Sequence, residues 1–167
     1  MHRGIAHILI ALMLLFPLSC ATATGPLFKE VQSEDYKGKA VVYFYRHSRT
    51  GSGSSYALEI NGHVTLPLLN KGYHLLVLEP GSHEFKVFDD SKVLKAENDF
   101  VFQADETYFI RYWAEIVGYK HGPIFILAPG GAPAMEAIFS QGVTSVPREE
   151  ALEVLNKCRL IEVTGKP

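Results

Sequence analysis

The stretch from Tyr56 to Asp89 constrains the fold most, because three turn signals divide it into four short apolar segments. Asn61-Gly62 is typical of a two-residue hairpin turn, in which both central residues need a positive φ. Asn70-Lys71-Gly72 favours a short loop with the glycine in the left-handed region. Glu79-Pro80-Gly81-Ser82 favours a tight turn with proline at its second position. We therefore predict an antiparallel meander of four strands: Tyr56–Ile60, His63–Leu69, Tyr73–Leu78 and His83–Asp89.

Other apolar segments predict further strands on both sides of this stretch. Their β-branched and aromatic content favours extended structure. The expected strands are Ala40–Arg46, Asp99–Gln103, Thr107–Ile116, Gly122–Leu127 and Leu160–Val163. Residues 92–99 are polar and are expected to be a crossing connection, 129–133 form a loop, and 134–139 fit either a strand or a helical turn.

One helix is predicted near residues 147–158. Pro147 suits the first turn of a helix, and Ser145 is available as its cap. Two glutamates follow in the first turn, where the helix dipole favours negative charge. The fold class is therefore mainly β: an antiparallel two-sheet β-sandwich of the immunoglobulin-like kind with one C-terminal α-helix, occupying residues 40–167.

The first 19 residues read as an export signal. Arg3 supplies a positive start, and Ile5–Phe16 is an apolar run, interrupted only by His7, that is too short to span a bilayer comfortably. The following Pro17-Leu18-Ser19-Cys20 resembles the lipobox of bacterial lipoproteins, although proline stands where leucine is usual. The resemblance implies a lipoprotein signal peptide over residues 1–19 and acylation of Cys20.

A second interpretation of this region stays open. Ala21-Thr22-Ala23 is an A-x-A site, and cleavage after Ala23 releases a soluble periplasmic protein. If Cys20 is acylated instead, the residue directly after it is Ala21 and not the aspartate that usually retains lipoproteins at the inner membrane. The expected location is then the outer membrane, facing the periplasm. Residues 20–39 are polar with a Gly25-Pro26 break, and we expect a flexible tether that reaches about 20–25 Å.

Composition and charge argue against several classes of function. The formal net charge is −2 and there is no basic tract, so we expect no nucleic-acid partner. The glycine-serine loop over 48–55 lacks the Gly-Lys-Ser/Thr and the helix of a phosphate loop.

His63 and His83 are placed to converge across two turns, but no histidines have the sequence spacing of a metal-binding pair. Cys158 is left without a disulfide partner. We expect no cofactor, no metal site and no catalytic residue, with an envelope hydrolase as a less favoured alternative.

An ordered series of short motifs runs from Ala40 to Trp113. It comprises Tyr43-Phe44-Tyr45-Arg46, the Gly51–Ser54 loop, Tyr56, Ile60-Asn61-Gly62, Leu68/Leu69, Gly72-Tyr73, Pro80-Gly81-x-His83 and Tyr108-Phe109-Ile110-Arg111. In this order the motifs resemble domain of unknown function 2846, a family of bacterial lipoproteins and related exported proteins. The part from Asn61 to His83 is also similar to PEGA-type surface modules, which are small β-sandwiches. The resemblance implies a cell-envelope lipoprotein with a sandwich fold, and it brings no catalytic residue with it.

Two of the predicted strands share a local pattern, Phe44-Tyr45-Arg46 and Phe109-Ile110-Arg111. Because strand side chains alternate, each arginine shares a face with the phenylalanine two residues earlier. One interpretation is that each arginine extends from the rim of the core with its stem buried. The other is that Arg46 and Arg111 lie on neighbouring strands and form a shared guanidinium surface for a carboxylate or phosphate of a partner.

Two classes of function follow for an envelope protein that is anchored to membrane lipid through Cys20. The first is a non-catalytic binding module for a protein or glycan, to which Tyr45 and Trp113 contribute aromatic surface beside the arginines. The second is an assembly subunit whose edge strand pairs with another envelope protein. A glycan-binding module would show a row of exposed aromatic side chains, whereas an assembly subunit would show an uncharged edge.

Overall fold

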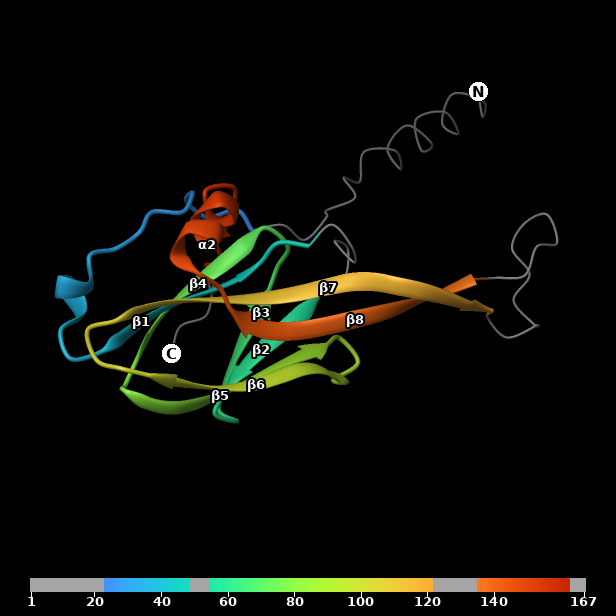
Figure 1. The fold of residues 1–167 in the computed structure, drawn as a ribbon, viewed down its shortest axis with the longest axis horizontal. Helices are drawn as coiled ribbons and strands as arrows, with labels where there is room; N and C mark the ends of the chain where they lie inside the picture. The colour runs from blue at the N-terminus through green and yellow to red at the C-terminus, as the bar shows by residue number, and fades with distance from the viewer. Residues whose placement is uncertain (1–22, 49–54, 122–134, 163–167) are drawn as a thin grey trace, which may run out of the picture.

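Two β-sheets and one α-helix make up the computed structural model, which describes residues 23–48, 55–121 and 135–162 (Figure 1). The predicted fold class, mainly β with two sheets and one C-terminal helix, is confirmed. Several predicted features lie outside the described residues. They are the signal peptide, Cys20, the loop at 49–54, the strand at 122–127 and the loop at 129–133.

The five-stranded sheet has the order β8-β7-β1-β4-β9. Its strands are β1 (Ala40–Arg46), β4 (Gly72–Leu78), β7 (Thr107–His121), β8 (Met135–Ser145) and β9 (Arg159–Leu160). β1 runs parallel to β7 and β4 runs parallel to β9, while β1–β4 and β7–β8 are antiparallel. The prediction of an antiparallel sandwich is therefore wrong for this sheet. Parallel pairs need a long connection: the chain forms the strands of the other sheet between β1 and β7, and it forms the C-terminal helix before β9.

The four-stranded sheet has the order β3-β2-β5-β6 and is antiparallel throughout. Its strands are β2 (Tyr56–Ile60), β3 (Val64–Leu68), β5 (Gly81–Asp89) and β6 (Leu94–Phe102). The predicted meander is wrong, because β4 belongs to the other sheet and β5 pairs with β2. The first three residues of β4 are buried, and the sheet that has a hydrophobic cluster on each face is the one that can cover them on both sides. The connection expected over 92–99 is also corrected, since β6 begins at Leu94.

The turn at Asn61-Gly62 has the predicted backbone, with φ of 53° and 70°. In the next turn the prediction is wrong, because Lys71 rather than Gly72 has the positive φ, at 54°. Gly72 is required for a different reason: a Cβ there would lie 2.6 Å from Cγ1 of Ile161. The remaining ambiguity, over 134–139, is resolved as strand from Met135 onward.

Two hydrophobic clusters lie on the two faces of the five-stranded sheet. Alternate residues of β1, such as Phe44, face the four-stranded sheet and form the larger cluster with Leu58, Phe85 and Ile110. The residues between them, such as Tyr43, face the helix and pack with the smaller cluster. Each face of β1 is therefore buried in a core of its own.

The helix α2 (Arg148–Leu155) covers the outer face of the five-stranded sheet (Figure 1). It starts after Pro147 as predicted and is shorter than expected at its end. Ser145 does not cap it, because Ser145 is the last residue of β8. Ala151 and Leu155 are the buried residues of this helix, and they pack against the smaller cluster.

The segment over residues 23–39 is part of the folded domain. Leu27 forms an antiparallel bridge with Arg159, and the Pro26 carbonyl accepts a hydrogen bond from the Leu160 amide at 2.9 Å. The ring of Phe28 packs edge-on against Tyr43 at a centroid distance of 5.1 Å. The prediction of a flexible tether is therefore wrong for these residues, because apolar side chains in the segment fill the outer core beside α2. No helix within the described residues is long and apolar enough to cross a membrane.

Candidate functional site

The two arginines proposed as a shared surface lie on adjacent strands and point to opposite faces of the sheet. The parallel register of β1 and β7 pairs Tyr45 with Arg111 and Arg46 with Tyr112. Arg46 is therefore offset from Arg111 by one position, and side chains one position apart in a strand face opposite ways. The strands are neighbours, as the shared-surface interpretation required, but the shared guanidinium surface is wrong.

Arg46 is fully buried between the two sheets, at 0% exposure. Its Nη1 donates to the Leu68 carbonyl at 3.2 Å, and its guanidinium carbon lies 4.5 Å from the ring centroid of Tyr56. Burial lowers the pKa of Arg46, against the opposing effect of Tyr56 and Tyr112. The face of an aromatic ring attracts a desolvated cation, so these contacts stabilise a charge that a partner cannot reach.

A second buried polar side chain makes a similar link between the sheets. His74 on β4 is 4% exposed, and its Nε2 donates to the Pro67 carbonyl at 2.6 Å. Burial lowers the pKa of His74, which keeps the ring neutral. Arg46 and His74 together bind consecutive carbonyl groups of β3, so their role in the described structure is to hold β3 against the other sheet.

Arg111 lies on the helix side of the sheet, where its Nη1 binds Oε1 of Glu150 at 3.0 Å. Tyr45 shares this face and is fully buried under α2. Burial raises the pKa of Tyr45 to about 12, against the opposing effect of nearby Arg111. Arg111 is therefore a bridge from β7 to the first turn of α2.

Trp113 is half-buried and lies over Gly142 of β8, where an added Cβ would be 2.8 Å from its indole nitrogen. Arg111 and Trp113 share one face and remain partly accessible. Arg46 and Tyr45 are inaccessible. The four residues predicted to contact a partner therefore do not form one site.

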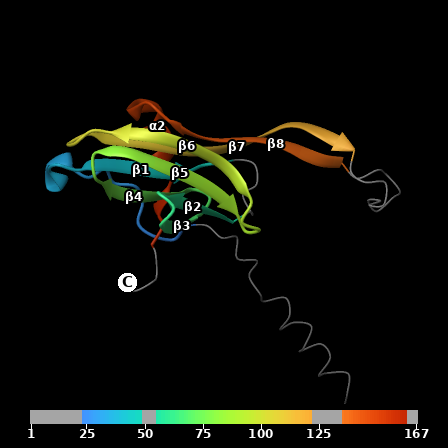
Figure 2. The ribbon, with the colours of Figure 1, turned by 90° about the horizontal axis from the view of Figure 1, so that it is seen from below.

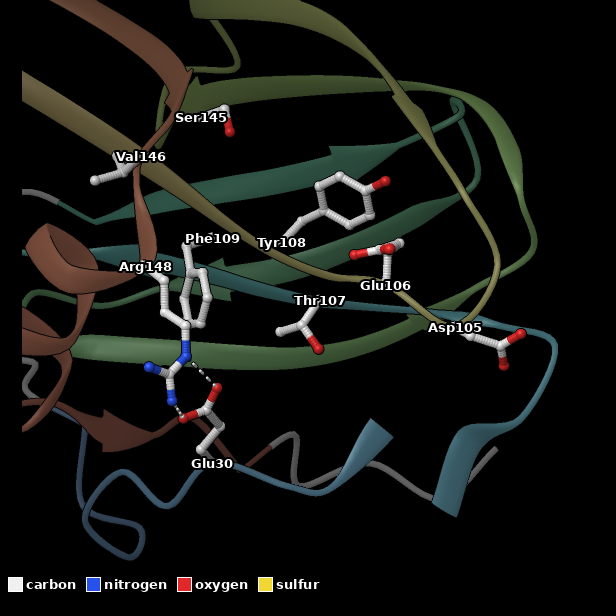
Figure 3. A pocket seen from close by; sticks show the side chains of 9 residues that line it. All are labelled: Glu30, Asp105, Glu106, Thr107, Tyr108, Phe109, Ser145, Val146 and Arg148. Carbon is white, nitrogen blue, oxygen red and sulfur yellow. Dashed lines mark hydrogen bonds and ion pairs between the residues drawn. The ribbon is translucent and has the colours of Figure 1, made fainter. Parts of the chain in front are cut away.

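A polar recess of about 370 Å³ opens beside the start of β7 (Figure 3). It is bounded by β7, the end of β8, the beginning of α2 and the segment before β1. The residues that line it are Glu30, Asp105, Glu106, Thr107, Tyr108, Phe109, Ser145, Val146 and Arg148. Three carboxylates against one guanidinium give the recess an acidic character.

Three of the four charged groups of this recess, those of Glu30, Asp105 and Arg148, are engaged in structural contacts. Arg148 binds Glu30 through two hydrogen bonds, Nε to Oε1 at 3.1 Å and Nη2 to Oε2 at 2.7 Å (Figure 3). Asp105 accepts a hydrogen bond from the Gly38 amide at 2.6 Å. Glu30 and Arg148 are 118 residues apart, and no local sequence signal connects them. The recess therefore fixes the segment before β1 to the helix, and it offers little that would recognise a ligand.

The other candidate chemical groups have structural partners too. Nε2 of His83 donates to the Glu79 carbonyl at 2.8 Å, and its Nδ1 accepts from the side-chain Nδ2 of Asn61 at 3.0 Å. In the described part of the chain no three His, Cys, Asp or Glu side chains are grouped to hold a metal ion. Cys158 is buried, and burial raises the pKa of its thiol to about 11, where a thiolate nucleophile does not form at neutral pH.

The outer edge of β3 differs from the other edge of its sheet. Within the described residues β3 pairs only with β2, and none of its five residues is charged. An apolar groove of about 480 Å³ lies beside it, lined largely by Val64 and Leu66 of β3 and by the second half of β4. On the opposite edge, β6 carries the charged residues Lys95, Glu97 and Asp99. Charged residues protect an edge from pairing with another chain, so of the two edges of this sheet β3 is the one without charged protection, and Pro67 interrupts it at one end.

Comparison with known proteins places the sequence in one family. The family described as Protein of unknown function (DUF2846) matches residues 36–132, which cover more than half of the chain. No curated protein matches the chain. The matched range includes the strands from β1 to β7 and excludes β8, α2 and β9.

Proposed function

Because the chain belongs to the DUF2846 family, whose function is unknown, we propose a role for it from its own residues: it is a bacterial envelope lipoprotein, anchored through acylated Cys20, that acts as a non-catalytic assembly subunit. The partner is another envelope protein that binds at β3. The observation that carries this proposal is the uncharged edge of β3 with an apolar groove beside it.

The groups that hold β3 support an assembly role. A free edge strand offers a row of backbone N–H and C=O groups to an incoming strand. Arg46 and His74 bind the β3 carbonyls at residues 68 and 67, so this end of the strand is held in place before a partner arrives and these two carbonyls are already occupied. Pro67 has no N–H to donate, which limits the length over which a partner strand can pair.

The exposed aromatic side chains favour this role over glycan binding. A glycan-binding surface needs several aromatic rings in a row on one face. Among the described residues only Tyr119 and Phe139 are exposed aromatic side chains, and both lie away from β3 on β7 and β8. A protein partner at the β3 edge therefore agrees better with the surface.

The position of Ala23 supports the lipid anchor over cleavage after that residue. Ala23 is 7% exposed, so the folded domain includes it. Cleavage after Ala23 would remove a residue that the domain buries, whereas cleavage before Cys20 keeps it. Cys20 precedes Ala23 by three residues, and a chain of that length spans at most about 10 Å. An acylated Cys20 would then hold the domain directly at the membrane surface.

Mass spectrometry of the native protein tests the anchor. We expect a mature N-terminus at Cys20 that carries acyl chains, which together hold the protein at the membrane effectively permanently. Cys20→Ser should abolish the acyl mass. A mature protein that starts at Thr24 without lipid would overturn the anchor and leave a soluble periplasmic protein.

Site-specific photo-crosslinking in cells tests the assembly edge. A photoreactive residue at Val64, which is 48% exposed on β3, should give a discrete adduct with another envelope protein. The matched control is Val101, which is 73% exposed on the β6 edge and should give none. Equal adducts at both positions, or none at Val64, would overturn the role of β3.

A further inference from the structure

The distal parts of β7 and β8 form a two-stranded ribbon that extends beyond the other strands, as Figures 1 and 2 show from two directions. β6 crosses the base of this ribbon at Val143, whose carbonyl accepts a hydrogen bond from Asn98 at 3.1 Å. Beyond that point several apolar side chains are exposed to solvent. They are Ile116 at 38%, Val117 at 61%, Tyr119 at 60%, Ile138 at 41% and Phe139 at 43%.

The pairing register shows which of these side chains share a face. The register of β7 and β8 is continuous from the pair Tyr112 and Val143, at the base of the ribbon, to the pair Ile116 and Phe139. Paired residues lie on the same face and alternate residues return to it. Ile116 and Phe139 therefore continue the face that is buried core at Tyr112 and Val143.

The bulge between Ile116 and Gly118 resets the alternation, and Tyr119 then pairs with Ala137 on the same face. Ile116, Tyr119 and Phe139 form what we call the apolar ribbon face. The opposite face carries Glu115, paired with Ser140, and Ile138, paired with Gly118. Val117 lies in the bulge, has no paired residue and is not assigned to either face. Among the paired residues beyond Val143, Ile138 is thus the exposed apolar side chain on the opposite face.

We propose that the apolar ribbon face binds the surface of a lipid bilayer. The three exposed side chains offer at most a few hundred Å² of surface that a partner could bury. A stable protein interface buries about 800 Å² on each partner. A second copy of the chain or a docked protein would need a larger complementary surface. A bilayer needs no such complementarity, and a tyrosine ring suits the boundary between headgroups and acyl chains.

The sequence next to the ribbon agrees with a lipid partner. Residues 122–134, which join the two strands and lie outside the described structure, contain no Asp, Glu, Lys or Arg. A charged side chain in this segment would oppose contact with hydrocarbon. Lys120, the charged residue of β7 nearest this end, is one position from Tyr119 and therefore lies on the opposite face from the apolar ribbon face. The inference deepens the proposed function and rests on it for the membrane location, since an anchor at Cys20 brings the domain to a bilayer.

The test is vesicle flotation with the chain from Ala21 onward, which keeps every residue of both hydrophobic clusters and has no acyl anchor. The probes are vesicles of phosphatidylcholine alone and vesicles of phosphatidylethanolamine with phosphatidylglycerol. We expect the chain to float with both. Phe139→Ser and Tyr119→Ser should each weaken binding on the order of fivefold to tenfold, because each removes an apolar side chain from the lipid contact.

Ile138→Ser is the matched control, because Ile138 is as exposed as Phe139 but lies on the other face of the ribbon. It should change binding less than about twofold, and thermal unfolding by circular dichroism should show that all three variants fold. Failure of the chain to float would overturn the proposal, as would equal losses for Ile138→Ser and Phe139→Ser. A dimer in solution that Phe139→Ser dissociates would assign the face to a second copy instead. The unacylated chain makes these results independent of whether Cys20 is lipidated.

Discussion

Arg46 donates a hydrogen bond to the Leu68 carbonyl at 3.2 Å and thereby joins β1 of one sheet to β3 of the other. His74 on β4 makes the neighbouring link, to the Pro67 carbonyl at 2.6 Å. Both side chains are buried, so neither link competes with water. The edge that we propose to bind a partner therefore depends on two buried polar residues of the opposite sheet.

Arg46→Ala should lower the free energy of unfolding by about 3 kcal/mol, because it leaves a cavity and an unpaired carbonyl in the core. Arg46→Met keeps most of the volume and removes a desolvated charge, so its loss should be smaller, about 1–2 kcal/mol, mainly from the Leu68 carbonyl. Urea unfolding measures both. Equal stability of the alanine variant and the wild type would show that Arg46 is not part of the core.

The stability of the domain should fall as the pH falls through about 6.5, the ordinary pKa of histidine. The pKa of His74 is lowered in the folded state, so the unfolded chain takes up this proton first and acid favours unfolding. The contribution of neutral His74 is present above that pH and is lost below it. His74→Gln retains a donor for Pro67 without a titrating ring, and urea midpoints at about pH 7 and pH 5 should then differ less than in the wild type. An unchanged pH dependence in His74→Gln would contradict this assignment.

Phe28→Ala should destabilise the domain by about 2 kcal/mol, because the ring packs edge-on against Tyr43 and against Tyr73 at 5.4 Å. The matched control is the adjacent Leu27→Ala, at a side chain that is 56% exposed, where the loss should stay within about 0.5 kcal/mol. Thermal or urea unfolding of the two variants measures the difference. Equal and negligible losses would restore the idea of a tether over this segment.

Gly142→Ala should change the fluorescence of Trp113, the only tryptophan in the chain. The added Cβ would lie 2.8 Å from the indole nitrogen, so the ring must move. Gly118→Ala on the same ribbon is the control, since the nearest atom to its Cβ would be 3.9 Å away. The emission maximum should shift in the first variant and stay unchanged in the second. The same shift in both would argue against the contact between Gly142 and Trp113.

Much of the local structure could be predicted because neighbouring residues determine it. Ala40–Arg46 and Tyr56–Ile60 are strands with the predicted bounds, as β-branched and aromatic residues favour extended backbone. Asn61-Gly62 adopts the predicted positive φ values, since few residue pairs tolerate them. Pro147 marks the start of the helix for an equally local reason, its fixed φ.

The partners of these elements were decided only in the tertiary structure. From the sequence alone, adjacency of β1 and β7 is part of only one of two interpretations of their shared pattern, and their parallel register offsets Arg46 from Arg111 by one position and places the two side chains on opposite faces of the sheet. The docking of the segment before β1 likewise depends on Glu30 meeting Arg148 across 118 residues. A strand's own residues specify which side chains share a face. Burial of each face depends on which strands from distant parts of the chain pack against it, and a shift of one residue in the pairing register moves every side chain to the opposite face.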